Sequence, residues 1–225
     1  MQKIAVIVAG GTGQRMGTAV PKQFLLLQGK PLLHHTIQRF LDAFPDIEII
    51  LVLPQEHLSA GAEITSAFTE STRIKITQGG NSRFQSVKNG LSLIHEPSVV
   101  FVHDGVRCLI SAGLIRRCYE QTLEKGSAIP AVAATDSIRI RNGQQHQVID
   151  RNQVQIIQTP QTFLSDLILP AFDRSYDERF TDEATVVEAS GKQVYLIEGE
   201  YTNIKITRPV DILMAEQIMI ASGKQ

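Results

Sequence analysis

A glycine-dense turn that directly follows a short apolar run near the N-terminus constrains this chain more than any other feature. The apolar run covers residues 4–9, and the turn, GGTGQRMG, covers residues 10–17. A β-branched run that ends at glycine is typical of a buried strand. Glycines after a strand let the backbone approach a bulky anion and point its N–H groups toward it. Arg15 and Lys22 add two cations seven residues apart, so our first hypothesis is a bound nucleoside triphosphate.

Two common phosphate motifs do not account for this turn. The dinucleotide-binding fingerprint G-x-G-x-x-G fails because Met16 occupies its third glycine position and Gly17 comes one residue late. A Walker A loop fails because the only early Gly-Lys pair, Gly29-Lys30, has Phe24 where the motif needs its first glycine. A turn that merely connects a strand to a helix remains the alternative.

Length and composition indicate one domain without a nucleic-acid or membrane partner. At 225 residues the chain can form a single α/β domain over 1–225 with a sizeable core. The net charge of −1 gives no reason to expect nucleic acid, and no apolar run approaches the roughly 20 residues that span a bilayer. The first residues become a strand at once, without signal-peptide features. Cys108 and Cys118 form neither a metal spacing nor a disulfide framework, so we expect a cytoplasmic protein.

Strand-like and helix-like patterns alternate along most of the chain. The strands are predicted at residues 4–9, 47–54, 73–77, 98–103, 128–134 and 193–198. The helices are predicted at residues 31–44, 55–70, 84–93, 164–173, 182–189 and 209–222, with Thr181 as the N-cap of the fifth. This rhythm predicts an α/β fold with a mostly parallel central sheet flanked by helices on both faces.

A second glycine turn, Gly79-Gly80-Asn81, follows the third predicted strand. Open α/β sheets bind ligands at the carboxyl ends of their strands, which is where this turn lies. Asn81 and Ser86 carry side chains that hydrogen-bond a base or a ribose. A capped helix start is an equally open interpretation of the same residues.

An aspartate follows the most apolar predicted strand, 98–103. Asp104 at the carboxyl end of a parallel strand is placed to hold a metal or a ribose hydroxyl, and magnesium accompanies most transferred triphosphates. Arg107, three residues later, is placed to clamp a phosphate. The alternative is that Asp104 caps the next helix.

The pattern changes at residue 135, where apolar and polar residues begin to alternate around Asn142-Gly143. Asn-Gly between alternating runs is the strongest short hairpin signal, so we expect a β-arm over 135–157. Its apolar face is thin, and an isolated two-stranded hairpin is marginal in water. We therefore expect the arm to lean on a second copy of the chain in a homodimer.

Taken together, the motifs resemble one enzyme family along nearly the whole chain. The segments AGGTGQRMG…PKQ, GGNSRFQSV, VHDGVR, DRN…QTPQTF, TDEATVVE and NIKIT occur in this order. Their set strongly resembles the 2-C-methyl-D-erythritol 4-phosphate cytidylyltransferase family of non-mevalonate isoprenoid synthesis. The resemblance implies a Rossmann-like nucleotidyltransferase fold with a protruding β-hairpin arm that embraces the other subunit of a homodimer.

The resemblance also implies roles for individual residues. The catalytic residues would be Arg15 and Lys22, which stabilise the pentavalent phosphorus and the leaving pyrophosphate, with Arg151 and Lys205, which position the attacking phosphate. The CTP site would comprise Ala9, Gly10, Gly11, Gly13, Gly80, Asn81, Ser86, Asp104 and Gly105. The polyol-phosphate site would comprise Arg107, Ser137, Arg151, Thr181 and Lys205, and Asp104 would contact the metal, Mg²⁺ or another divalent cation.

The reaction implied by the resemblance is a direct displacement. A phosphate oxygen of methylerythritol phosphate attacks the α-phosphorus of CTP in line, and pyrophosphate departs. Because the attacking oxygen is already an anion at neutral pH, no general base is required, and catalysis reduces to positioning and charge neutralisation.

Departures from the family pattern leave alternatives open. Gly10 replaces an alanine, Gly105-Val106 replaces Ala-Ala, and Ser137 replaces a threonine. The AGG opening also resembles ribitol 5-phosphate cytidylyltransferase, whereas Arg151 favours methylerythritol phosphate. An NAD-dependent dehydrogenase is disfavoured by the missing third glycine. A non-catalytic nucleotide-binding dimer would retain the same fold.

Overall fold

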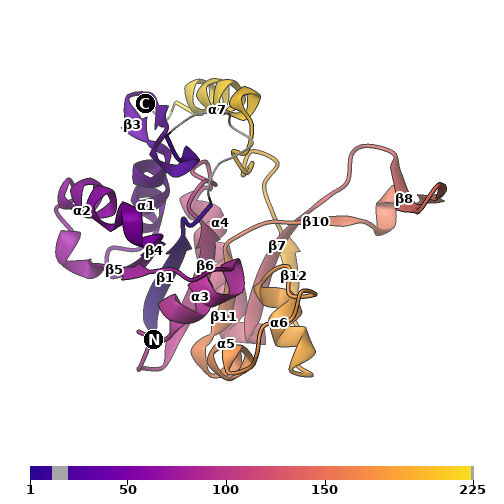
Figure 1. Cartoon of the computed structure of the whole chain (residues 1–225), viewed down its shortest axis with the longest axis horizontal. Coiled ribbons are helices and arrows are strands. Elements are labelled where there is room, and N and C mark those ends of the chain that lie inside the picture. Colours follow the sequence, from indigo (N-terminus) through magenta and orange to yellow (C-terminus); the bar gives the residue numbers. More distant parts are fainter. Residues whose placement is uncertain (12–19, 224–225) are drawn as a thin grey trace.

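The computed structural model of the chain describes residues 1–11 and 20–223. Its centre is a sheet in which β1 (Gln2–Val8) pairs in parallel with β4 (Glu48–Leu53) on one side and β6 (Ser98–Asp104) on the other. β5 (Ile74–Gln78) extends the sheet in parallel beyond β4. The apolar runs that predicted β1, β4 and β6 are buried at the centre of the molecule, and β5 forms the edge of the sheet (Figure 1). This arrangement confirms the predicted parallel sheet.

The other half of the sheet is mixed. β11 (Gln161–Leu164) runs antiparallel to both β6 and β7 (Ser127–Ala133). β10 (Gln155–Ile157) pairs antiparallel with the later residues of β7, so it continues the line of β11 on the same edge. β12 (Leu196–Glu198) pairs in parallel with the opposite edge of β7.

Helices cover both faces of this sheet. One face carries α1 (Leu32–Ala43), α2 (Leu58–Ser66) and α4 (Ala112–Lys125). The opposite face carries α3 (Arg83–Leu91), α5 (Ser165–Phe172) and α6 (Glu183–Ala189). The last helix, α7 (Pro209–Ala221), packs with the short hairpin of β2 (Leu26–Leu27) and β3 (Lys30–Pro31).

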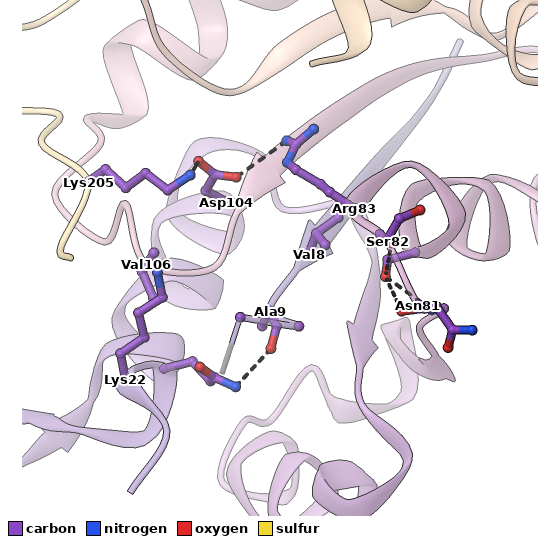
Figure 2. Close-up of a pocket in the computed structure, with 14 residues that line it drawn as sticks. Val8, Ala9, Lys22, Asn81, Ser82, Arg83, Asp104, Val106 and Lys205 are labelled. Atoms are coloured by element: carbon purple, nitrogen blue, oxygen red, sulfur yellow. Dashed lines mark hydrogen bonds and ion pairs between the residues drawn. The ribbon is translucent and has the colours of Figure 1, made fainter. Parts of the chain in front are cut away.

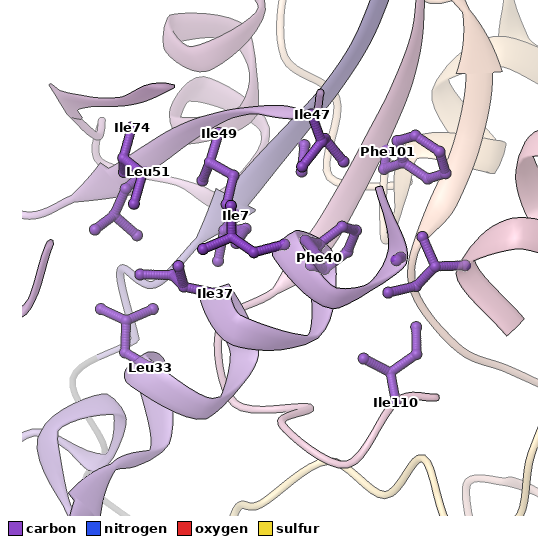
Figure 3. Packing of buried hydrophobic residues seen from close by; sticks show 14 of the residues in the cluster. Ile7, Leu33, Ile37, Phe40, Ile47, Ile49, Leu51, Ile74, Phe101 and Ile110 are labelled. Atoms are coloured by element: carbon purple, nitrogen blue, oxygen red, sulfur yellow. The ribbon is translucent and has the colours of Figure 1, made fainter. Parts of the chain in front are cut away.

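Strand β1 shows why these runs look continuously apolar in the sequence. Ala5 and Ile7 point into the core beneath α1, while Ile4 and Val6 point into the core beneath α3. Successive side chains on a strand face opposite ways, so a strand covered on both faces is apolar at every position. Figure 3 shows Phe40 and other α1 residues packed over the strands of the first core.

Helix α3 approaches the sheet closely because a glycine faces it. A Cβ on Gly90 would lie 2.6 Å from Val6 Cγ1 and 2.9 Å from Val52 Cγ2. No side chain fits in that gap, so the helix sits directly on β1 and β4. The turn that begins α3 is thereby held over the carboxyl ends of the strands.

The hairpin around Asn142-Gly143 is present but shorter than predicted. β8 (Ile138–Asn142) pairs antiparallel with β9 (Gln145–Ile149), and Gly143 begins the connecting loop at φ +62°. The hairpin projects from the body of the protein, and Val148 on it is 65% exposed (Figure 1). The predicted span of 135–157 is too long, because residues 155–157 return to the main sheet as β10.

The structure contains two elements that the sequence patterns did not predict, helix α4 and strand β11. One predicted helix cap is also wrong. Thr181 is not the N-cap of α6, because the side chain of Asp182 accepts the hydrogen bond from the Thr185 backbone N–H at 2.9 Å. The charged carboxylate is the stronger acceptor at a helix N-terminus. Among the described residues, no helix has the length and apolar character needed to cross a membrane.

Candidate active site

A pocket of about 250 Å³ opens at the carboxyl ends of the parallel strands. Its walls come from the end of β1, from the turn between β5 and α3, and from the turn after β6 (Figure 2). Lys22 and Lys205 complete the pocket from two further segments. This edge of an α/β sheet is where ligands bind in such folds, as the two glycine turns predicted.

The glycine turn after β1 is fixed from below. The side chain of Gln23 is buried, and its Nε2 donates to Ala9 O at 2.9 Å. A Cβ on Gly11 would lie 3.2 Å from Lys22 Cε, so the lysine side chain lies along the backbone of that glycine. Ala9, Gly10, Gly11 and Lys22 therefore come together as predicted, whereas Gly13 and Arg15 lie outside the described residues.

The second glycine turn combines a helix cap with a pocket wall. Ser82 Oγ accepts from the Gln85 backbone N–H at 3.1 Å, and Gly80 N–H donates to Ser86 Oγ at 3.1 Å. A Cβ on Gly80 would lie 2.2 Å from Gln85 Cγ, so only glycine fits there. Gly80, Asn81 and Ser86 all line the pocket, so the capping and the ligand-binding interpretations are compatible.

Asp104 lies at the centre of a cluster of cations. Its Oδ1 is 3.3 Å from Arg83 Nη2, and its Oδ2 is 2.9 Å from Lys205 Nζ and 3.4 Å from Arg107 Nε. Burial alone would raise the pKa of Asp104, but the three cations hold that pKa well below its ordinary value. The carboxylate is therefore ionised and faces three cations, one of which, Arg83, it shares with Glu183. Asp104 does not cap a helix, because Ser111 is the N-cap of α4.

Arg83 was not among the predicted site residues. It lines the pocket and forms a two-point ion pair with the buried Glu183 at the start of α6, with Nη2 3.2 Å from Oε2. Burial lowers the pKa of Arg83, but Glu183 and Asp104 outweigh it and raise that pKa above its ordinary value. A permanent cation is thus held against the second glycine turn. The sequence signal that could have identified Arg83 as a site residue is its position three residues after the Gly79-Gly80 pair.

Lys205 reaches Asp104 because its segment is attached to the turn after β6. Ile206 N–H donates to Val106 O at 3.1 Å, and Arg107 Nη1 donates to Asn203 O at 2.8 Å. Arg107 is largely buried below the pocket and does not line it. The backbone at Gly105 packs closely against the end of β1, because a Cβ at Gly105 would lie 2.9 Å from Ala9 Cβ. Gly105 thus connects the turn after β6 to the turn after β1, but it does not itself line the pocket.

The other predicted substrate residues do not meet the pocket within one chain. Ser137, Arg151 and Thr181 are exposed, and none of them lines the pocket. Arg151 Nη1 donates to Thr135 O at 2.7 Å at the base of the hairpin.

The described residues fit a divalent cation that is held mainly by a nucleotide. Asp104 is the one carboxylate among the described residues that line the pocket. Within 1–11 and 20–223 there is no cluster of three or more His, Cys, Asp or Glu residues suited to a metal. Magnesium often binds through one or two carboxylates together with substrate phosphates, so a single carboxylate suffices.

Comparisons with known proteins agree on one family. The family model of 2-C-methyl-D-erythritol 4-phosphate cytidylyltransferase matches residues 3–221. The protein of that name from Bacteroides fragilis is 40% identical over 219 residues, which cover 97% of this chain and 100% of the relative. The one from Porphyromonas gingivalis is 41% identical over 220 residues, covering 97% of this chain and 98% of the relative.

Solved structures give the same result. The 2-C-methyl-D-erythritol 4-phosphate cytidylyltransferase of Thermus thermophilus is 30% identical with a TM-score of 0.73, covering 96% of this chain and 98% of that one. The 4-diphosphocytidyl-2C-methyl-D-erythritol synthase of Anaerococcus prevotii is 26% identical with a TM-score of 0.83, covering 97% and 99%.

Proposed function

This chain belongs to the 2-C-methyl-D-erythritol 4-phosphate cytidylyltransferase family, and we propose how the described site performs that reaction. The enzyme transfers the cytidylyl group of CTP to 2-C-methyl-D-erythritol 4-phosphate, giving 4-diphosphocytidyl-2-C-methyl-D-erythritol and pyrophosphate. One observation carries the proposal for the site. Lys22, Arg83 and Lys205, from three separate segments, line one pocket between the two glycine turns.

The CTP triphosphate lies along Gly10 and Gly11, where Lys22 faces the phosphates. The backbone N–H groups of such a turn and one lysine supply positive charge without a bulky side chain. The cytosine lies against Gly80 and Asn81 at the second glycine turn. Both placements are supported by the pocket, which these two residues line together with Gly10, Gly11 and Lys22.

The chemical step is an in-line displacement at the α-phosphorus. An anionic oxygen of methylerythritol phosphate forms the new P–O bond, and the bond from the α-phosphorus to the bridging oxygen of pyrophosphate breaks. Charge increases on the leaving pyrophosphate, and Lys22 and Arg15 stabilise it there.

Asp104 is the residue that would hold a divalent cation, Mg²⁺ in the first instance, together with the phosphates of CTP. When bound, the cation neutralises charge on the phosphates of the nucleotide. The observation that supports this cation site is that Asp104 is the single carboxylate lining the pocket in the described part of the chain.

The second substrate binds between the subunits of a homodimer. Lys205 receives its phosphate near Asp104, and Arg107 supports that position from beneath through its ion pair with Asp104. Ser137 and Arg151 reach the substrate from the partner subunit, and Thr181 also contacts it. The supporting observation is that these three residues are exposed, with Ser137 and Arg151 at the base of a projecting hairpin. We also place the enzyme in the cytoplasm, where its two buried free thiols, Cys108 and Cys118, stay reduced.

The test is an assay of pyrophosphate release from CTP and Mg²⁺ with a panel of polyol phosphates. We expect turnover with methylerythritol phosphate and little with ribitol 5-phosphate. Turnover with ribitol 5-phosphate alone would overturn the substrate assignment. Lys22→Ala should lose at least about a hundredfold in turnover while keeping the wild-type circular dichroism. A protein that binds CTP but turns over no member of the panel would be a nucleotide-binding dimer instead.

A further inference from the structure

A fully buried histidine lies directly beneath the proposed site and has no part in the chemistry described so far. His103, the residue before Asp104 on β6, is 0% exposed. Its Nδ1 lies 3.0 Å from Thr159 Oγ1, and its Nε2 lies 3.2 Å from Arg107 O. The ring of Phe40 packs edge-on against it, with centroids 5.1 Å apart. Both ring nitrogens of His103 therefore have a hydrogen-bond partner, which fixes the orientation of the imidazole.

The partners of His103 settle which nitrogen carries the proton. Arg107 O can only accept, so Nε2 must donate to it. Thr159 Oγ1 already accepts from the Asp104 backbone N–H, so the proton of its hydroxyl is available for His103 Nδ1. Nδ1 is therefore an acceptor, and the hydroxyl of Thr159 donates to it.

The same hydroxyl also holds the backbone of Asp104. Asp104 N–H donates to Thr159 Oγ1 at 3.1 Å. One continuous chain of hydrogen bonds thus runs from the Asp104 N–H through Thr159 and His103 to the carbonyl of Arg107. It begins at the first residue of the turn after β6 and ends at the fourth, so it spans the two ends of that turn.

We propose that His103 and Thr159 are positioning residues for cytidylyl transfer, which hold the Asp104–Arg107 turn so that Asp104 faces the pocket and Arg107 holds the segment that carries Lys205. This inference rests on the proposed function of the site. The turn is anchored elsewhere by Gly105, whose N–H donates to Val8 O at 2.9 Å and whose carbonyl accepts from Thr36 Oγ1 at 3.0 Å. These anchors hold its middle, and the His103–Thr159 pair holds its ends.

Thr159 also connects the turn to the segment that carries Lys205. Its carbonyl accepts from Asn203 Nδ2 at 2.9 Å, and Asn203 O in turn accepts from Arg107 Nη1 at 2.8 Å. A change at the Thr159 hydroxyl leaves the buried Asp104 N–H and His103 Nδ1 without partners. Buried polar groups that lose a partner move to regain one, and a shift of about 1 Å at reacting groups can cost a hundredfold in rate.

The kinetic test compares Thr159→Val, which keeps the shape but removes the hydroxyl, with Thr159→Ser, which keeps the hydroxyl. We expect Thr159→Val to lower kcat by about tenfold to a hundredfold with a smaller change in KM for CTP, and Thr159→Ser to stay near wild type. Both variants are normalised to folded protein by thermal melting. Equal kcat values for the two variants would overturn the proposal, because filling of space alone would then explain Thr159.

A second measurement on the unaltered protein does not depend on folding of a variant or on activity. Nitrogen-15 NMR of the histidine side chains at pH 7 should show His103 as the neutral Nε2–H tautomer with an accepting Nδ1. A neutral Nδ1–H tautomer or a charged ring would contradict the assigned hydrogen-bond directions. If the tautomer is as expected but the substrate panel gives no turnover, the proposed function fails while the hydrogen-bond chain stands.

Discussion

Lys205 Nζ lies 2.9 Å from Asp104 Oδ2, so a lysine near the end of the chain completes an ion cluster that begins at the end of β6. Asp104 holds three cations near one pocket: Arg83 at the start of α3, Arg107 in the turn after β6, and Lys205 before α7. Like charges at such distances repel, and the shared carboxylate is what keeps them together. This arrangement supports the proposal that the phosphate of the second substrate binds beside Lys205.

Replacing Lys205 by methionine should remove the charge but keep the length of the side chain. We expect turnover to fall by about a hundredfold to a thousandfold, as for loss of one preorganised group that stabilises developing charge. The melting temperature should change little, because the side chain is 39% exposed. Steady-state kinetics with both substrates measure the effect. Lys192→Met, on the exposed turn after α6, is the control and should behave as wild type.

Replacing Asp104 by asparagine should change both stability and its dependence on pH. The folded-state pKa of Asp104 lies below its ordinary value of 3.8, so its ionised form stabilises the fold above about pH 4. That stabilisation is lost as the pH falls further toward the folded-state pKa. Asp104→Asn should lower the free energy of unfolding at pH 7 by about 3 kcal/mol, because Lys205 and Arg107 lose their carboxylate and Arg83 keeps only Glu183.

Urea unfolding between pH 7 and pH 3 measures this effect. Wild type should lose stability more steeply than Asp104→Asn below about pH 4. Asp136→Asn, on the exposed segment before β8, serves as the control. Parallel pH profiles for wild type and Asp104→Asn would show that the carboxylate is not held by its cations.

Mixed dimers should reveal whether a site is shared between subunits. A heterodimer of Lys22→Ala and Arg151→Ala chains would contain one site with both changes and one intact site. We expect the heterodimer, purified through two different tags, to recover about half of wild-type turnover, as a two-fold symmetric dimer with shared sites requires. Each variant alone should be nearly inactive.

The matched control combines Lys22→Ala with Lys205→Met. Both residues line the same pocket of one chain, so neither site of that heterodimer is intact and no activity should return. Recovery in this control, or its failure in the Arg151 mixture, would argue against substrate contacts from the partner's arm.

Two helix glycines should respond in opposite directions to alanine. Gly90 faces β1 and β4, where a Cβ would lie 2.6 Å from Val6 Cγ1, so Gly90→Ala should destabilise the protein by about 1–3 kcal/mol. Gly113, in the first turn of α4, is exposed, and a Cβ there would come no closer than 3.5 Å to a neighbouring atom, Ser111 Oγ. Gly113→Ala should stabilise by about 0.5–1 kcal/mol because alanine loses less entropy in a helix. Chemical denaturation measures both.

The strands of the central sheet could be predicted from the sequence because burial on both faces leaves apolar residues at every position. β11 was missed because its first two residues are polar, although Gln161 and Thr162 are buried. Gln161 is satisfied by α6, since its Nε2 donates to Asp182 Oδ2 at 2.8 Å and its Oε1 accepts from Ala184 N–H at 2.7 Å. A polar strand of this kind becomes visible only when its partners are known.

Helix α4 was missed for a related reason. Its buried face consists of Leu114, Ile115, Cys118 and Thr122, and only the first two are clearly apolar in the sequence. Their spacing is helical once the cysteine and the threonine are counted as buried residues.

The candidate site could be predicted where its residues follow strands and glycines, as with Gly80 and Asp104. The contacts between distant segments could not. The ion pair of Arg83 with Glu183 depends on α6 lying beside the start of α3, and the His103–Thr159 contact depends on how β11 returns to β6. Local patterns report which element a residue belongs to, whereas these pairings depend on how the elements pack.

The projecting hairpin leaves the main sheet and rejoins it at a single rung. Ala133, the last residue of β7, pairs directly with Gln155, the first residue of β10, so everything between them is an insertion whose two ends already lie side by side. A short turn could join these strands without disturbing the sheet, and a hairpin of another length or sequence could take the same place. Ser137 and Arg151, the two residues proposed to reach the second substrate from the partner subunit, both lie within this insertion. A replacement of the hairpin would therefore change this substrate contact and the proposed dimer contact together, while Lys205 stays in the body of the protein.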